Sequence, residues 1–124
     1  MIFVGKPTEE MINTYNRLLT AQEKTIKQLN NDNNPVSVDQ FCRQQLTGYQ
    51  VYSHSTGHGV GLQIHEYPKI SFTSTDVLKS NQVITIEPGV YIEGKWGMRI
   101  EDMVLIKKDG VEILTKFSKQ LLII

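Results

Sequence analysis

Residues 83–106 read VITIEPGVYIEGKWGMRIEDMVLI, and this stretch decides the class of fold. Residues 83–87 alternate between the two faces of an extended chain, and most of residues 98–106 does the same, which is typical of β-strands. The dipeptides at 88–89 (Pro-Gly) and 109–110 (Asp-Gly) are turn signals, and the second fits a hairpin before a further apolar run. We therefore predict that this half of the chain forms antiparallel strands.

Two helices are predicted before these strands. Thr8 is a candidate N-cap for the first, in which apolar residues recur at near-helical spacing until the asparagine-rich residues 30–35. In the second, Ser37 and Gln40 form a capping-box pattern, and Gly48 is a suitable stop. Helices followed by antiparallel strands predict an α+β fold, with the helices packed on one face of the sheet.

Composition limits the classes of function. The chain has 124 residues, which suits a single domain over residues 1–124, and its 13 basic and 13 acidic residues cancel. No basic field favours nucleic acid or an anionic membrane, and no apolar run is long enough to span a bilayer. The single cysteine, Cys42, cannot form an internal disulfide and fits a reducing compartment. We expect a cytoplasmic protein that binds neither nucleic acid nor membrane.

All three histidines, His54, His58 and His65, lie with three glycines in residues 54–68, HSTGHGVGLQIHEYP. The glycines weigh against a helical zinc site, because each costs a helix about 1 kcal/mol relative to alanine. They fit a place where the backbone approaches a site closely. An even spacing puts His54 and His58 on one face of an extended chain, with His65 brought round by a bend. The alternative is three unrelated imidazoles in turns or in the core, because spacing alone names no metal.

Two glutamates accompany these histidines. Glu87 ends an apolar strand on the same face as Val83 and Thr85, and Glu101 shares a face with Arg99. An acid within an apolar strand is seldom buried without a partner. The alternative is a surface pair of Glu101 with Arg99, or a strand end at solvent. Carboxylates with imidazoles suit borderline divalent metals such as Mn, Co, Fe or Zn, so the combination favours a metal site.

Three ordered blocks, HSTGHGVGLQIHEYP, IEPGVY and GMRIED, are very similar to the C-terminal half of the pita-bread metallopeptidases. These include the Xaa-Pro dipeptidases, aminopeptidase P and methionine aminopeptidase. The RIED block and the helical stretch GKPTEEMINTYNRLLTAQEKTI favour the Xaa-Pro branch. The resemblance covers essentially the whole chain. It implies the second half of a pita-bread domain, with two N-terminal helices packed on a curved antiparallel sheet.

The resemblance also implies a metal centre. In the family, two divalent ions (Mn, Co or Zn) activate a water that attacks the peptide carbonyl. Carried over by position, His58 is the histidine ligand and Glu87 is a carboxylate on the same ion. Glu101 then bridges both ions. The implied reaction is hydrolysis of Xaa-Pro peptide bonds.

The remaining motif residues are implied to act on the substrate. His54 and His65 flank it, hydrogen-bonding its backbone and steadying the tetrahedral intermediate. Arg99 orients the bridging carboxylate or a neighbouring group. The alternative is a non-catalytic pita-bread module that binds peptides or proteins, because some relatives have lost catalysis.

One departure from the family matters. Its site takes two aspartates from an upstream DxG…SDxTRT-like pattern, and residues 1–124 contain neither part of it. We expect a truncated segment that binds at most one metal weakly and is inactive alone. Met1–Val4 is an apolar run that would leave an unpaired strand edge. We therefore expect homo-oligomers formed through that edge or through an exposed face of the half-domain.

Overall fold

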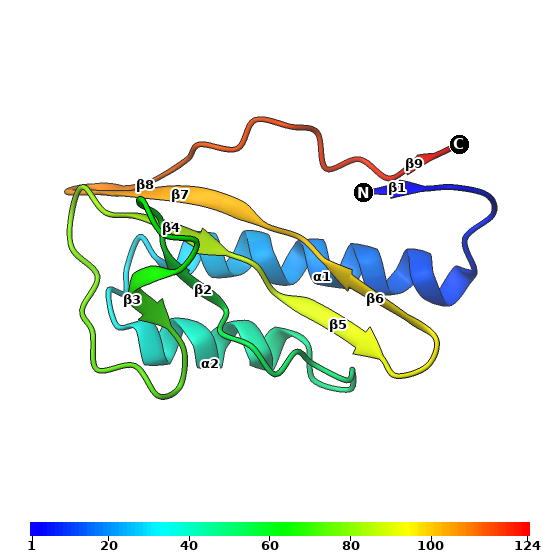
Figure 1. The fold of residues 1–124 in the computed structure, drawn as a ribbon, viewed down its shortest axis with the longest axis horizontal. Helices are drawn as coiled ribbons and strands as arrows, with labels where there is room; N and C mark the ends of the chain where they lie inside the picture. The colour runs from blue at the N-terminus through cyan, green and yellow to red at the C-terminus, as the bar shows by residue number, and fades with distance from the viewer.

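The computed structural model describes all residues 1–124 and contains two helices and nine short strands (Figure 1). The helices are α1 (Glu9–Gln28) and α2 (Pro35–Gln45). The strands are β1 (Ile2–Phe3), β2 (Gly57–Gly59), β3 (Glu66–Ile70), β4 (Val83–Ile86), β5 (Gly89–Ile92), β6 (Trp96–Arg99), β7 (Asp102–Lys107), β8 (Gly110–Ile113) and β9 (Leu122–Ile123). The element order is that of the α+β fold predicted above. No helix is both long enough and apolar enough to cross a membrane.

The helix starts follow from local capping. α1 begins after Thr8, whose side chain accepts a hydrogen bond from the Met11 N–H. The capping box predicted at Ser37 is wrong, because α2 begins at Pro35 and its N-cap is Asn34. The Asn34 side chain accepts from the Val36 N–H, and the fixed φ of proline suits the first position of a helix.

Five strands form an antiparallel sheet in the order β3-β2-β4-β7-β8, and β5 and β6 form a separate hairpin. The predicted hairpin at residues 109–110 is confirmed, since it joins β7 to β8. The turn predicted at residues 88–89 is wrong, because β4 runs on into β5 there. Ile86 pairs with Asp102 at the end of β4, and Gly89 pairs with Arg99 at the start of β5.

We call residues 87–88 and 100–101 the sheet junction, because both strands pass there from the larger sheet to the hairpin. The Ile100 N–H donates to the carbonyl of Pro88 across it, at 3.3 Å. Ile100 is buried, and its neighbour Glu101 is exposed. Two residues far apart in sequence, Glu87 and Glu101, are therefore brought to facing positions on neighbouring segments.

Both helices pack on one face of the strands, as Figure 1 shows. The first core cluster joins the C-terminal part of α1 to the larger sheet; its buried members are Ile26, Leu29, Val38, Ile70, Leu78, Ile84, Ile86, Val104 and Ile106. The second joins the rest of α1 to the hairpin; its buried members are Tyr15, Leu18, Ala21, Leu46, Tyr52, Val90, Met98 and Ile100. The side chains that alternate with these apolar residues point away from the helices, and this leaves the opposite face for a site.

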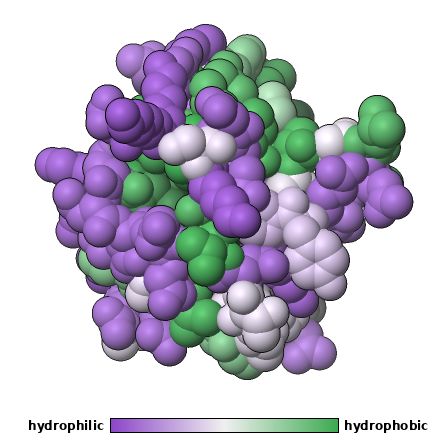
Figure 2. All heavy atoms as spheres, turned by 90° about the vertical axis from the view of Figure 1, so that its left-hand side faces the viewer, coloured by the Kyte–Doolittle hydropathy of each residue, from purple (hydrophilic) through white to green (hydrophobic).

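The chain ends lie side by side. β1 pairs in parallel with β9, a strand that the sequence does not predict. The expectation that Met1–Val4 leaves an unpaired strand edge is therefore wrong on one side, because Leu122 and Ile123 pair with it there. Several apolar side chains remain exposed; they include Ile2, Leu62, Ile64, Phe117 and Ile124. Figure 2 shows apolar residues among hydrophilic ones at another end of the molecule. Self-association stays a prediction.

Candidate metal centre

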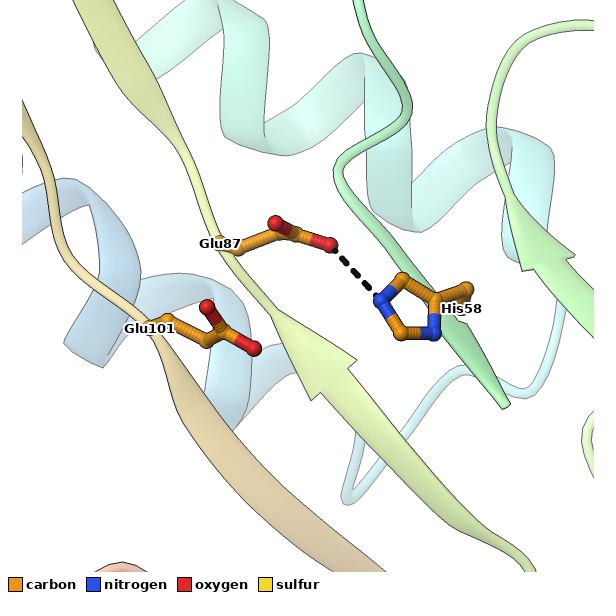
Figure 3. Close-up of side chains that lie close together, drawn as sticks. All are labelled: His58, Glu87 and Glu101. Carbon is orange, nitrogen blue, oxygen red and sulfur yellow. Dashed lines mark ion pairs between the residues drawn. The ribbon is translucent and has the colours of Figure 1, made fainter. Parts of the chain in front are cut away.

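His58, Glu87 and Glu101 converge on one point at the sheet junction (Figure 3). One donor atom from each lies within 4.8 Å of the other two, and His58 Nε2 is 3.2 Å from Glu87 Oε1. Donor atoms about 2.1 Å from a shared ion lie roughly 3–4 Å apart, so small side-chain movements suffice to surround one ion. The donor set of one imidazole and two carboxylates fits a borderline divalent cation.

The His58 ring is held in one tautomer. Its Nδ1 lies 2.9 Å from the carbonyl oxygen of Gly59. Because a carbonyl oxygen only accepts, Nδ1 carries a proton and Nε2 faces the carboxylates. Histidines that bind metals are usually oriented in this way, by a hydrogen bond from the other ring nitrogen.

Glu87 is almost fully buried and is held from several sides. The Thr85 hydroxyl donates to Glu87 Oε1 at 3.1 Å and accepts from the backbone N–H of His58 at 3.0 Å. Arg99 Nε lies 3.7 Å from Glu87 Oε2. The backbone N–H of Glu87 donates to the carbonyl of Thr56 at 2.7 Å. The alternation of the strand predicts that Thr85 faces the same way as Glu87, although its hydrogen bonds were not predicted.

Glu101 is held quite differently. It is exposed, and its carboxylate makes no hydrogen bond or ion pair. The alternative surface pair between Glu101 and Arg99 is wrong, because Arg99 contacts Glu87 instead. Glu101 therefore has a carboxylate that is free to turn towards a ligand.

The centre opens into a cavity of about 480 Å³. All but one of its lining residues are polar or charged; they are His54, Ser55, His58, His65, Glu66, Tyr67, Lys69, Glu87 and Arg99. The structure thus brings together five of the six residues singled out from the sequence, and the sixth, Glu101, lies within reach of the ligand atoms of His58 and Glu87. A cavity with such a lining suits the polar groups of a peptide backbone.

The other two histidines differ in their surroundings. His65 is exposed, and its ring lies edge-to-face with that of His58 at 4.6 Å. His54 donates from Nδ1 to the Ser55 carbonyl at 2.7 Å, which leaves Nε2 to accept from the Tyr91 hydroxyl at 3.0 Å. Tyr91 was missed in the sequence, although it lies four residues after Glu87, a spacing that puts both on one face of a strand.

Residues 1–108 match the family model described as metallopeptidase family M24. The "Xaa-Pro dipeptidase" of Pyrococcus furiosus is 42% identical over 124 residues, covering 98% of this chain and 36% of that protein. The "Xaa-Pro dipeptidase" of Pyrococcus horikoshii is 40% identical, covering 98% of this chain and 35% of that protein.

Solved structures agree with these matches. The prolidase from Pyrococcus horikoshii superposes with a TM-score of 0.90 at 40% identity, covering 98% of this chain and 36% of that one. An X-Pro aminopeptidase from Thermotoga maritima superposes with a TM-score of 0.87 at 37% identity, covering 98% of this chain and 35% of that one. The present chain therefore spans about a third of the length of the relatives it matches.

Proposed function

This chain belongs to metallopeptidase family M24, and from that premise we propose that its cavity is part of a site that hydrolyses Xaa-Pro peptide bonds with a divalent metal. The predicted α+β pita-bread fold is confirmed by the solved neighbours. Because the chain spans only about a third of its relatives, the activity and substrate of a whole protein are proposed rather than established. The observation that carries the proposal is the convergence of His58, Glu87 and Glu101.

We propose that His58 and Glu87 would hold one ion, and that Glu101 would be the carboxylate available to it and to a second. Glu87 is held beside His58 while Glu101 is free to turn, which is compatible with these roles. Two carboxylates also offset the charge of a bound cation. A bound Mn, Co or Zn ion would polarise a peptide carbonyl and acidify water beside it. The protein's own part is to hold His58 and Glu87 in place before the cation arrives.

Of the remaining residues, His54 and His65 act on the peptide and Arg99 acts on a metal ligand. His65 is exposed in the cavity beside His58, where an imidazole N–H can donate to a carbonyl oxygen as negative charge develops on it. His54 lies in the same cavity with its ring oriented by Tyr91. Arg99 acts on Glu87, since the two side chains are in contact, and so orients a metal ligand.

Binding of Mn²⁺ to the 124-residue chain, measured by calorimetry, tests the metal assignment. We expect at most one weakly bound ion per chain and no significant turnover, because residues 1–124 contain one such ligand group. His58→Ala should abolish binding, while His65→Ala should leave it unchanged. Two tight sites, robust turnover by the purified chain, or unchanged binding by His58→Ala would contradict the proposal.

Turnover is best tested in a chimera. Residues 1–124 would replace the matching segment of the Pyrococcus furiosus Xaa-Pro dipeptidase, which is 42% identical to them. In an active chimera, His65→Ala should lower kcat on a Xaa-Pro dipeptide by about 100-fold or more, with metal content unchanged. A chimera that binds the dipeptide and metal without turnover would instead favour the peptide-binding module.

A further inference from the structure

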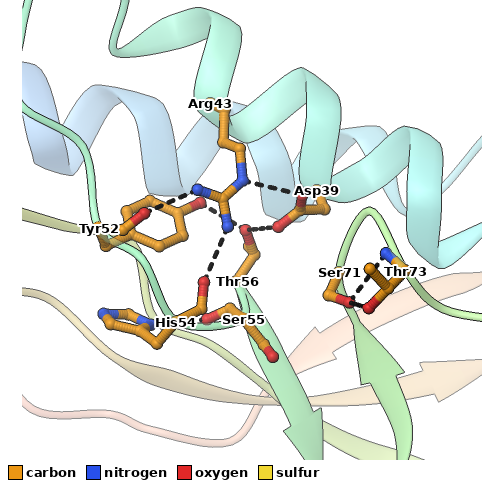
Figure 4. A network of polar contacts seen from close by, with 8 residues as sticks. All are labelled: Asp39, Arg43, Tyr52, His54, Ser55, Thr56, Ser71 and Thr73. Atoms are coloured by element: carbon orange, nitrogen blue, oxygen red, sulfur yellow. Dashed lines mark hydrogen bonds and ion pairs between the residues drawn. The ribbon is translucent and has the colours of Figure 1, made fainter.

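Arg43 of α2 reaches two backbone carbonyls in the loop that carries His54 (Figure 4). Its Nη1 donates to the carbonyl of Tyr52 and its Nη2 to the carbonyl of His54, each at 2.8 Å. Its Nε donates to Asp39 Oδ2 at 2.9 Å, one helical turn back on α2. All of these bonds use the fixed, planar geometry of the guanidinium group, which a lysine cannot reproduce.

Arg43 also acts on the His54 ring through Tyr52. The guanidinium carbon lies 4.3 Å from the centre of the Tyr52 ring. The Tyr52 ring in turn stacks on the His54 ring, with centres 4.8 Å apart and planes 28° apart. Guanidinium, phenol and imidazole therefore form a continuous stack, and the same arginine fixes both the backbone and the ring position of His54.

The ion pair between Arg43 and Asp39 is anchored by further contacts. Asp39 is fully buried, and its Oδ1 accepts a hydrogen bond from the Thr56 hydroxyl at 2.6 Å. Burial lowers the pKa of Arg43, but the hydrogen bond and charge of Asp39 together raise it by more. The pKa is therefore above its usual value, and the guanidinium remains charged. The carbonyl of Thr56 accepts a hydrogen bond from the backbone N–H of Glu87. The contacts thus continue from α2 to the metal centre.

We infer that Asp39 and Arg43 are positioning residues that set the His54 imidazole relative to the metal centre. His54 takes part in substrate binding only under the proposed function, so the catalytic consequence rests on that proposal. The placement of the His54 ring does not rest on the proposed function, because it follows from the contacts of Arg43 and Tyr52 alone. A merely structural ion pair would stabilise the fold without a selective effect on His54.

Proton NMR of the histidine rings tests the placement in the 124-residue chain. The aromatic current of Tyr52 shifts the stacked His54 ring protons upfield, so Arg43→Lys should move them downfield. The signals of His58 and His65 should stay in place. Arg17→Met, at an exposed arginine of α1, is the control for loss of charge, and circular dichroism checks folding. Arg43→Met also removes the charge and should move the His54 signals downfield as well; if that variant unfolds, Arg43→Lys still decides the matter. Unmoved His54 signals, or equal shifts of all three histidines, would overturn the inference.

A double-mutant cycle in the active chimera tests the catalytic consequence. Arg43→Lys should lower kcat/KM by about 10-fold where His54 is present, in the range usual for residues that orient a functional group. In a His54→Ala background, Arg43→Lys should lower kcat/KM by less than about 2-fold, because the effects of two residues that act together are not additive. Equal losses in both backgrounds would overturn the inference. A chimera without turnover would count against the proposed function, while the ring signals would still decide the positioning role.

Discussion

Glu87 and Glu101 occupy facing positions at the sheet junction, yet the protein treats them in opposite ways. Glu87 is 8% exposed and touches Thr85, His58 and Arg99. Glu101 is exposed and makes no polar side-chain contact. The difference arises from their neighbours. The Glu87 segment lies against Thr56, next to β2, whereas the Glu101 segment lies past the end of β8.

This contrast suggests how the proposed metal centre would be assembled. A carboxylate that is already oriented loses little freedom when it binds a cation, so Glu87 and His58 would form the fixed half of the proposed centre. An unrestrained carboxylate loses its freedom on binding, so Glu101 would form the adjustable half. Substitutions in the fixed half should therefore lower both the stability of the fold and metal binding. Substitutions in the adjustable half should lower metal binding alone.

The largest effect is expected where β2 meets the fixed half. A Cβ at Gly57 would lie 1.8 Å from the carbonyl oxygen of Thr85, a backbone atom that cannot move aside. Gly57→Ala should therefore cost about 4 kcal/mol or more of unfolding free energy, measured with urea, or prevent folding. Gly61→Ala is the control, because its Cβ would meet only the flexible Glu66 carboxylate. Equal stability of the two variants would show that the contact between the strands is not rigid.

Truncating each acid tests the contrast directly. Glu87→Ala should lower the unfolding free energy by about 2–3 kcal/mol, because it leaves the buried Thr85 hydroxyl without an acceptor and removes the contact with Arg99. Glu101→Ala should change it by no more than about 0.5 kcal/mol, as surface substitutions usually do. Both variants should lose Mn²⁺ binding in calorimetry. Similar stability losses would remove the distinction between the two halves.

A smaller change addresses how Glu87 is oriented. Thr85→Val keeps the shape of the side chain but removes the hydroxyl that links Glu87 to the His58 N–H. We expect Mn²⁺ affinity to fall about 10-fold and stability by about 1–2 kcal/mol. Thr20→Val, at an exposed threonine of α1, is the control and should leave affinity unchanged. Unchanged affinity in Thr85→Val would mean that the ion, and not the protein, orients Glu87.

The smallest effect concerns a carboxylate that is held as Glu87 is, but away from the cavity. Burial raises the pKa of Asp32, but hydrogen bonds from the Ser37 hydroxyl and the Asn34 N–H lower it by more, so the pKa lies below its usual value. A lowered pKa means that the stabilisation is present above the unfolded pKa of about 3.9 and is lost as pH falls through the folded pKa.

Asp32→Asn should therefore cost about 1 kcal/mol of unfolding free energy at neutral pH. The difference in unfolding free energy between Asp32→Asn and the wild type should shrink as the pH falls below about 4. Urea unfolding at several pH values measures this, with Glu93→Gln, at an exposed glutamate, as the control. A difference that does not change with pH would show that the charge of Asp32 is not what stabilises the start of α2.

The sequence by itself determined the features that depend on local periodicity and motif order. The alternation of residues 83–87 correctly put Thr85 and Glu87 on one face, opposite the buried Ile84 and Ile86. The three ordered blocks were sufficient to identify the family and the fold. Such signals are readable because the backbone geometry of a strand or helix fixes which nearby residues share a face.

Only the tertiary structure decided which distant residues meet. The pairing of β1 with β9, the contact of Arg99 with Glu87 rather than Glu101, and the reach of Arg43 to the His54 loop carry no local pattern. The start of α2 at Pro35, capped by Asn34, also differed from the capping box predicted at Ser37. These contacts result from packing α2 and the strands around a shared core, and residue spacing along the chain does not encode the distances that packing sets.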